Sequence, residues 1–243
     1  MSRKLLLALL GTALAGLSLG ACAEGDIAAQ QAPATLSGEA PAQGAGAPAG
    51  DAPEVPADAP LVVFLGDSIA AGHQLPASEA FPAAVQRELA RQGTPFRLVN
   101  AGVSGDTSAG GLRRIDWVLR QAPDVVVIEL GGNDGLRGQP PEALEENLRG
   151  IVERSRAAGA EVLLLGLRLP PSLGPEYVRG FEAVYPGLAA ELGLAYVDHF
   201  MEGVGGVPEL NLEDGLHPTA EGHRRIAARV APALRSLLER LAE

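Results

Sequence analysis

The chain has 243 residues, of which 47% are hydrophobic, and this content excludes a chain that is disordered throughout. One cysteine excludes a disulfide framework, and a net charge of −11 argues against a basic nucleic-acid-binding surface. The charge is unevenly spread: residues 1–22 carry two basic residues and no acid, whereas residues 23–60 carry six acids and no base. We therefore expect three different kinds of chain, of which only the last, from residue 61, folds into a domain.

Residues 1–22 have the layout of an export signal, because a short basic start precedes a run of apolar and small residues. The alternative is a leader that stays as a transmembrane helix, since about 20 apolar residues can span a bilayer. Leu19-Gly20-Ala21-Cys22 resembles the bacterial lipobox. This resemblance implies that residues 1–21 are a signal peptide and that Cys22 is lipidated as the mature N-terminus. Ala23, where an inner-membrane retention signal often places Asp, implies the outer membrane.

Residues 23–60 contain 13 Ala, 6 Pro and 5 Gly, with almost no large apolar side chain to compensate for ordering. We expect residues 22–60 to be a disordered, semi-extended linker between the lipid anchor and a domain over residues 61–243. Two or more acyl chains would hold the protein at a membrane that faces the periplasm or the cell exterior. We expect a monomer.

From residue 61 onward, short apolar runs alternate with helical periods. Runs that are apolar on both faces and bounded by Gly, Pro, Asp or Asn predict buried parallel strands at Leu61–Leu65, Phe96–Val99, Val125–Leu130, Val162–Gly166 and Leu194–Val197. Helices are predicted at about 79–92, 109–121, 141–158, 176–192 and 219–241. The fold class is therefore α/β, a three-layer α/β/α sandwich on a five-stranded parallel sheet. Five strands fit a flavodoxin-like order, although the pattern alone does not decide strand order.

Ligands of open α/β sheets bind beyond the carboxyl ends of the strands, so the loops that follow the strands matter most. Four of these loops carry chemistry: Gly66-Asp67-Ser68-Ile69, Asn100 to Thr107, Gly131-Gly132-Asn133-Asp134, and Asp214-Gly215-Leu216-His217-Pro218. They bring a serine, a glycine turn, an asparagine and an Asp/His pair to one edge. This is the inventory of a hydrolase, with a nucleophile, oxyanion donors, a base and an acid that orients the base.

Each motif alone has an ordinary explanation. Asp and Ser after a strand form turns, Gly-Gly-Asn-Asp is also turn-forming, and a His before a helix can simply cap it. The serine does not lie in the Gly-x-Ser-x-Gly elbow of α/β-hydrolases, because Ala70 replaces the second glycine. The combination of all four loops, in this order, is what favours catalysis.

The chain resembles an SGNH (GDSL-type) hydrolase. The four motifs that carry this resemblance are GDSI, NAGVSGDTS, ELGGNDGLRG and DGLHP. The sequences of the second and third motifs are similar to those of the bacterial thioesterase, lysophospholipase and arylesterase branch. The same holds for Arg168-Leu169-Pro170-Pro171 and Tyr177. Ile69 replaces the Leu of GDSL. The resemblance covers nearly all of residues 61–240.

The resemblance implies a catalytic Ser68, Asp214 and His217, and an oxyanion hole built from Ser68, Gly105 and Asn133. It also implies that the segment after Asn133 is a substrate loop, which would make Asp134, Gly135 and Leu136 substrate-binding residues together with Leu169. No cofactor is needed, and no clustered His, Cys and carboxylate set has zinc-like spacing, so we expect no catalytic metal.

We therefore predict a serine esterase that acts on aryl esters, lysophospholipids or acyl thioesters. Apolar residues near the site favour acyl chains over sugars: Leu75, Leu136, Leu167, Leu169 and Leu173. The alternatives are a carbohydrate O-acetylesterase on the same fold, or a tethered binding protein that has lost catalysis.

Five further residues receive simpler interpretations. We expect His73 either to border the pocket or to lie in a surface loop, and His199 and His223 to be structural or exposed. Glu129, an acid inside an apolar strand, is expected to support the active-site loops through hydrogen bonds or an ion pair, since an unpaired buried charge is costly. Trp117 is expected to pack in the core.

Overall fold

A computed structural model describes residues 55–243, so the predicted signal peptide, Cys22 and most of the predicted linker lie outside the described residues. The strands are β1 (Leu61–Gly66), β2 (Arg97–Gly102), β3 (Val125–Glu129), β4 (Glu161–Leu165) and β5 (Ala195–Val197). The α-helices are α1 (Ser68–Ala71), α2 (Phe81–Arg91), α3 (Ser108–Leu119), α4 (Gly132–Leu136), α5 (Pro141–Ala157), α6 (Pro175–Leu192) and α7 (Ala220–Leu241). Short 3₁₀ turns are η1 (Ala77–Glu79), η2 (Pro171–Leu173) and η3 (Pro208–Leu210).

The five strands form one parallel sheet in the order β2-β1-β3-β4-β5, so the predicted fold class and the flavodoxin-like order are confirmed. After β1 the chain moves outward to β2 and then returns to β3 on the other side of β1. This reversal creates a switch point at the carboxyl ends of β1 and β3. Gly66 is level there with Gly102 of β2 and with Glu129 of β3.

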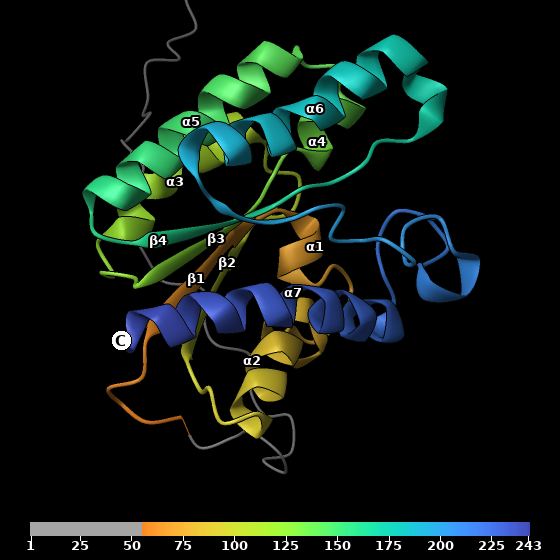
Figure 1. Cartoon of the computed structure of the whole chain (residues 1–243). Coiled ribbons are helices and arrows are strands. Elements are labelled where there is room, and N and C mark those ends of the chain that lie inside the picture. The colour runs from red at the N-terminus through yellow and green to blue at the C-terminus, as the bar shows by residue number, and fades with distance from the viewer. Residues whose placement is uncertain (1–54) are drawn as a thin grey trace, which may run out of the picture. The chain divides into compact units, whose positions relative to one another are not determined.

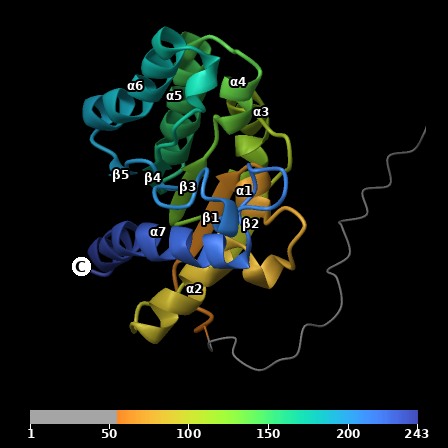
Figure 2. The ribbon, with the colours of Figure 1, turned by 90° about the vertical axis from the view of Figure 1, so that its right-hand side faces the viewer.

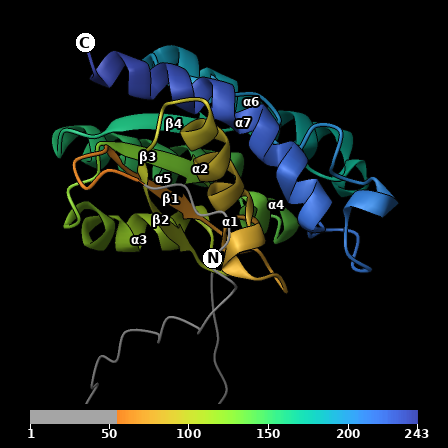
Figure 3. The same ribbon diagram turned by 90° about the horizontal axis from the view of Figure 1, so that it is seen from below.

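Helices cover both faces of the sheet, as Figure 1 shows: α3, α5 and α6 lie on one face, and α2 and α7 lie on the other. The view turned about the vertical axis separates these two layers (Figure 2), and the view from below shows α2 and α7 in front of the strands (Figure 3). Because both faces are covered, all residues of β1 and β3 are buried, which is why these strands are apolar without alternation.

The five long helices follow the predicted ranges because each presents a regular apolar stripe to the sheet. In α7 the stripe comprises Ile226, Val230, Leu234, Leu237 and Leu238, all buried. The two short helices α1 and α4 were not predicted, because four or five residues are too few to show a helical period. Both begin directly beyond strands of the switch point, where they carry candidate site residues.

Trp117 corrects one prediction, because its side chain is 54% exposed rather than packed in the core. On α3 the residues that face the sheet are Ile115 and Val118, both fully buried. A helix turns by about 100° per residue, so Trp117, between them in sequence, points to a different side. Size and apolarity suggested burial, but the helical phase decides it.

The folded part begins before residue 61. Ala59 is buried, and the carbonyl oxygen of Pro60 accepts a hydrogen bond of 2.8 Å from the Arg97 N–H at the start of β2. The end of the predicted linker therefore already contacts the domain. Within residues 55–243, no helix has the length and apolar character needed to cross a membrane.

Helix α3 offers a direct test of this packing. Ile115→Ala should lower the free energy of unfolding by about 2–5 kcal/mol, since it leaves a cavity against the sheet. Trp117→Ala should change it by about 0.5 kcal/mol or less, because an exposed side chain is lost. Urea denaturation followed by circular dichroism measures both. An equal loss in the two variants would contradict the helical phase described above.

Candidate active site

Three side chains from two segments far apart in the sequence form a hydrogen-bonded chain at the carboxyl edge of the sheet. Ser68 is the first residue of α1, directly after β1, and His217 lies 149 positions further on, before α7. The Nε2 atom of His217 is 2.9 Å from Oγ of Ser68, and its Nδ1 atom is 2.6 Å from Oδ2 of Asp214. The structure thus brings together the three residues predicted as nucleophile, base and orienting acid.

Asp214 is held in place by the turn that it begins. Its Oδ1 atom accepts hydrogen bonds from the backbone N–H of Leu216 at 2.9 Å and of His217 at 3.0 Å. These bonds and the contact with the His217 ring hold the pKa of Asp214 well below its usual range. A carboxylate with this pKa stays ionised and keeps the imidazole in one orientation, as an orienting acid requires.

Glu129, the last residue of β3, supports the turn that presents Ser68. Its Oε2 atom accepts hydrogen bonds from the backbone N–H of Asp67 at 3.1 Å and of Ala70 at 3.2 Å. A Cβ atom at Gly66 would lie 2.5 Å from this same oxygen, so glycine permits the close approach. Burial, followed by the nearby Asp67, raises the pKa of Glu129 well above its usual range. The predicted supporting role of Glu129 is confirmed.

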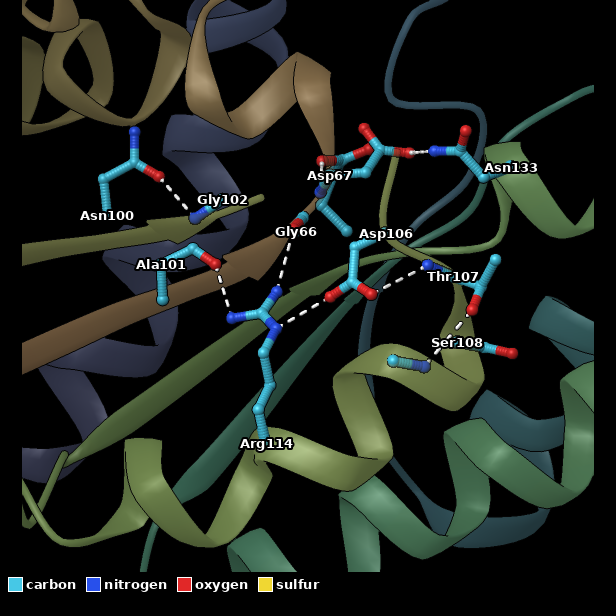
Figure 4. Close-up of polar contacts among 12 residues, drawn as sticks. Gly66, Asp67, Asn100, Ala101, Gly102, Asp106, Thr107, Ser108, Arg114 and Asn133 are labelled. Atoms are coloured by element: carbon cyan, nitrogen blue, oxygen red, sulfur yellow. Dashed lines mark hydrogen bonds and ion pairs between the residues drawn. The ribbon is translucent and has the colours of Figure 1, made fainter. Parts of the chain in front are cut away.

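Asp67 links the Ser68 turn to Asn133. Its Oδ1 atom accepts from the Ile69 N–H at 2.9 Å and caps α1, while its Oδ2 atom accepts from the side-chain amide of Asn133 at 3.1 Å (Figure 4). Burial raises the pKa of Asp67 to about 6, against the hydrogen bonds from Ile69 and Asn133, which lower it. The sequence pattern marks Asp67 only as part of a turn, so this connection was not predicted.

The predicted oxyanion donors come from three loops around this point. Asn133 lines the cavity described below, whereas Gly105 lies in the exposed loop before α3 with φ at +79°, a left-handed conformation that favours glycine. Among residues 55–243, no acceptor is found for the backbone N–H of Ser68 or of Gly105. Arg137 donates to the carbonyl oxygen of Gly105 at 3.0 Å, which ties the end of α4 to this loop.

Arg114 of α3 joins the ends of β1 and β2 to the loop that contains Gly105. Its guanidinium donates to the carbonyl oxygens of Ala101 and Gly66 at 2.7 and 3.0 Å, and to Asp106 at 2.7 Å (Figure 4). Five donors in a fixed plane suit this simultaneous binding. No motif pointed to Arg114, because its partners lie on three separate segments.

A cavity of about 580 Å³ opens beside the Ser68 hydroxyl. Of the five leucines expected near the site, Leu136, Leu167 and Leu169 line it, whereas Leu75 and Leu173 do not. Sequence reasoning missed most of the opposite wall, which comes from the segments after β4 and β5 and from the turn before His217: Pro170, Pro171, Phe200, Met201, Gly205, Gly206 and Leu216. The cavity is thus mainly apolar, with Ser68, Asn133 and His217 at the reacting end and two further polar side chains, Arg168 and His199, on the segments after β4 and β5.

Asp134 and Gly135, predicted to bind substrate, are not among the lining residues. The side chain of Asp134 is 3% exposed, and it accepts hydrogen bonds from both the backbone N–H, at 2.8 Å, and the hydroxyl of Ser108. Asp134 therefore caps the N-terminus of α3, where a carboxylate is favoured. Leu136 and Leu169, predicted with them, do line the cavity.

The remaining histidines take different places. His223 is buried, and its Nδ1 atom accepts from the Phe81 N–H at 3.1 Å, so the predicted structural role is confirmed. Its burial lowers its pKa to about 4. His199 is half-buried and lines the cavity, a position that the sequence pattern did not indicate. The ring of His73 contacts that of His217 in a tilted arrangement, with centroids 4.1 Å apart.

Comparison with known proteins now identifies the family. The profile of the GDSL-like Lipase/Acylhydrolase family matches residues 64–225, which include Ser68, Gly105, Asn133, Asp214 and His217. The chain belongs to this family. Membership confirms the SGNH (GDSL-type) resemblance drawn from the four motifs.

Individual proteins similar to this chain are also esterases or thioesterases by name. Esterase TesA of Pseudomonas aeruginosa is 47% identical over 183 residues, which are 75% of this chain and 91% of the relative. Thioesterase 1/protease 1/lysophospholipase L1 of Escherichia coli K12 is 41% identical over 183 residues, covering 75% of this chain and 86% of the relative. Among solved structures, a crystal structure of TesA has a TM-score of 0.71 at 47% identity, covering 73% of this chain and 99% of that one.

The raised pKa of Asp67 predicts a pH dependence of stability. Between its ordinary value of 3.8 and about 6, Asp67 is protonated in the folded chain and ionised in the unfolded chain. Protonation of Asp67 therefore stabilises the folded state. This stabilisation is fully present below pH 3.8 and is lost as the pH rises through 6. In Asp67→Asn the group no longer titrates. Between pH 4 and 7.5, wild type should therefore lose on the order of 2–3 kcal/mol of stability relative to Asp67→Asn.

Urea denaturation of both proteins at several pH values measures this difference. The slope with pH is the relevant quantity, because replacing the side chain also removes hydrogen-bond acceptors. This slope reports the Asp67–Glu129 pair, since Asp67 also raises the pKa of Glu129. A stability difference that does not vary between pH 4 and 7.5, or one that varies in the opposite direction, would contradict the raised pKa.

Proposed function

We propose that this protein hydrolyses acyl esters through an acyl-serine intermediate on Ser68. Its class, a carboxylic ester hydrolase, follows from the family and from the TesA and thioesterase relatives. The observation that carries the proposal is the continuous Ser68–His217–Asp214 hydrogen-bonded chain beside a mainly apolar cavity.

The geometry supports a two-step reaction. His217 accepts the Ser68 proton as Oγ attacks the acyl carbonyl carbon, and the same proton then passes to the leaving alkoxide, thiolate or phenolate. Asp214 stabilises the imidazolium that forms in between. Water, deprotonated by His217, then attacks the acyl-serine and releases the acid, which regenerates Ser68.

We propose that, in both steps, the developing oxyanion accepts hydrogen bonds from the backbone N–H groups of Ser68 and Gly105 and from the side-chain amide of Asn133. Asp67 accepts from that amide, and an NH₂ group has a second hydrogen for the oxyanion. Removing one such donor typically lowers turnover by about 10²–10³.

The proposed substrates are acyl chains longer than acetyl, carried as aryl esters, lysophospholipids or thioesters. An acetyl group would leave most of a cavity of about 580 Å³ unfilled, whereas a longer chain can contact Leu167, Leu169 and Phe200. The predominance of apolar residues in this lining favours an acyl chain over the carbohydrate of the alternative, an O-acetylesterase, for which Arg168 and His199 are the polar side chains that the segments after β4 and β5 offer.

The chain-length preference tests this proposal. Initial rates on p-nitrophenyl esters from acetate to palmitate should give a higher kcat/KM for medium chains than for acetate, since each buried CH₂ contributes about 0.8 kcal/mol. Leu136→Asp should reduce kcat/KM for octanoate about tenfold or more with little change for acetate. Leu241→Asp is the matched control, because both leucines are exposed, by 46% and 42%, but Leu241 lies at the end of α7. Activity confined to acetate would favour the O-acetylesterase instead.

We also propose that the chain is exported and anchored through a lipidated Cys22, with the active domain facing the periplasm or the cell exterior. The support is the basic start of the leader, the Leu19-Gly20-Ala21-Cys22 motif, and the acidic Ala/Pro/Gly segment that follows. The proposal further includes a monomeric enzyme that meets its substrates at the membrane surface.

Two variants test the anchor. Removing residues 1–54 should leave a water-soluble enzyme with turnover close to that of the full chain, because the contacts of Ala59 and Pro60 are kept. Cys22→Ser in the full chain should move the protein out of the membrane fraction or block its processing, without changing kcat. A Cys22→Ser protein that stays in the membrane with an uncleaved leader would indicate a transmembrane helix instead.

A further inference from the structure

His73 lies directly over the catalytic imidazole because of how α1 ends. Gly72 adopts a left-handed conformation with φ at +74°, which terminates the helix, and the His73 N–H donates to the Ser68 carbonyl oxygen at 3.0 Å. This geometry turns the next side chain back toward the nucleophile. The His73 and His217 rings then lie against each other in a tilted arrangement, with centroids 4.1 Å apart and an interplanar angle of 34°.

His73, His217 and Asp214 together form a set of metal-binding donors at the mouth of the site. One nitrogen or oxygen ligand atom from each of the three side chains lies within 4.8 Å of the others. Two imidazoles and one carboxylate, with a fourth position open to water, are a donor set that Zn²⁺ commonly takes. The site is accessible, because the side chains of Asp214 and His217 remain partly exposed, the former by 37%.

We propose that His73, Asp214 and His217 bind a zinc-like divalent cation, and that binding reversibly switches the enzyme off. Both ring nitrogens of His217 already serve the reaction, Nδ1 with Asp214 and Nε2 with Ser68. Coordination through either nitrogen therefore breaks one of the two hydrogen bonds. The cation takes no part in ester hydrolysis. It inhibits the enzyme only because it coordinates a nitrogen of His217, the general base.

Binding requires only a modest movement of His73. Its Nε2 atom is held by a single exposed contact, 3.2 Å from the Gln74 amide nitrogen, and this contact is easily exchanged for a metal bond. Rotation of the His73 ring out of this ring contact lets its nitrogen and a His217 nitrogen converge on one ion about 2.0–2.1 Å from each. Hard cations such as Mg²⁺, which prefer oxygen ligands, should not bind here.

The test compares three full-length proteins that all carry Cys22→Ser, so that the cysteine thiol adds no zinc site. The first has no other change, the second carries His73→Phe, and the third carries His199→Phe. Phenylalanine keeps an aromatic ring over His217 but has no ligand atom. His199 is the matched control, because it also lies at the cavity but is not part of the donor set.

Equilibrium dialysis against buffered free Zn²⁺ measures binding, and p-nitrophenyl ester hydrolysis, relative to each protein's own metal-free rate, measures inhibition. We expect His73→Phe to weaken both the Zn²⁺ affinity and the inhibition at least tenfold, His199→Phe to change neither, EDTA to restore activity, and Mg²⁺ to have no effect. Equal inhibition of the His73→Phe protein, Zn²⁺ binding without inhibition, or no saturable Zn²⁺ binding would overturn the proposal. The inhibition arm rests on the proposed esterase activity, whereas the dialysis arm does not.

Discussion

The active site depends on the hydrogen bonds that the side chain of Glu129, buried at the end of β3, accepts from the turn before Ser68 and from α1. This side chain accepts the N–H groups of Asp67 and Ala70, so it sets the turn that begins α1 and presents Ser68. A buried acid is costly, and the two backbone donors would themselves be costly without an acceptor. Asp67 extends the link by accepting from the Asn133 amide, so one pair of acids couples the Ser68 turn to Asn133, the proposed nucleophile and oxyanion donor. The raised pKa values of both acids are the cost of this arrangement.

The site joins two environments that arise from different parts of the fold. Its polar side is rigid, because β1, β2 and β3 end at the same level and Arg114 ties two of these ends to the loop that carries Gly105. Its apolar side comes from irregular segments after β4 and β5. The division suits ester hydrolysis, since the reacting carbonyl needs fixed donors whereas an acyl chain needs only apolar surface.

Much of this arrangement can be predicted from sequence, for physical reasons. The strands are buried on both faces and the long helices are amphipathic, so their patterns are strong, and Ser68, Asn133, Asp214 and His217 lie in motifs beyond strand ends. Properties that depend on tertiary pairing were less accessible. The exposure of Trp117 was mispredicted because the phase of α3 decides it. The contact of Asp134 with Ser108 depends on the pairing of two distant segments. Arg114 was missed because its partners, two backbone carbonyls and the Asp106 carboxylate, lie on separate segments.

The central claim is that Ser68 is the nucleophile and that His217 activates it. The most direct measurement is the rate and position of covalent labelling by a fluorophosphonate, followed by mass spectrometry of proteolytic peptides. The account predicts one adduct, on Ser68, which is absent in Ser68→Ala and forms at least about 100-fold more slowly in His217→Asn, since a positioned general base typically contributes 10²–10⁴ in rate. An adduct on another serine, such as Ser104 or Ser108, or an unchanged labelling rate in His217→Asn, would contradict it.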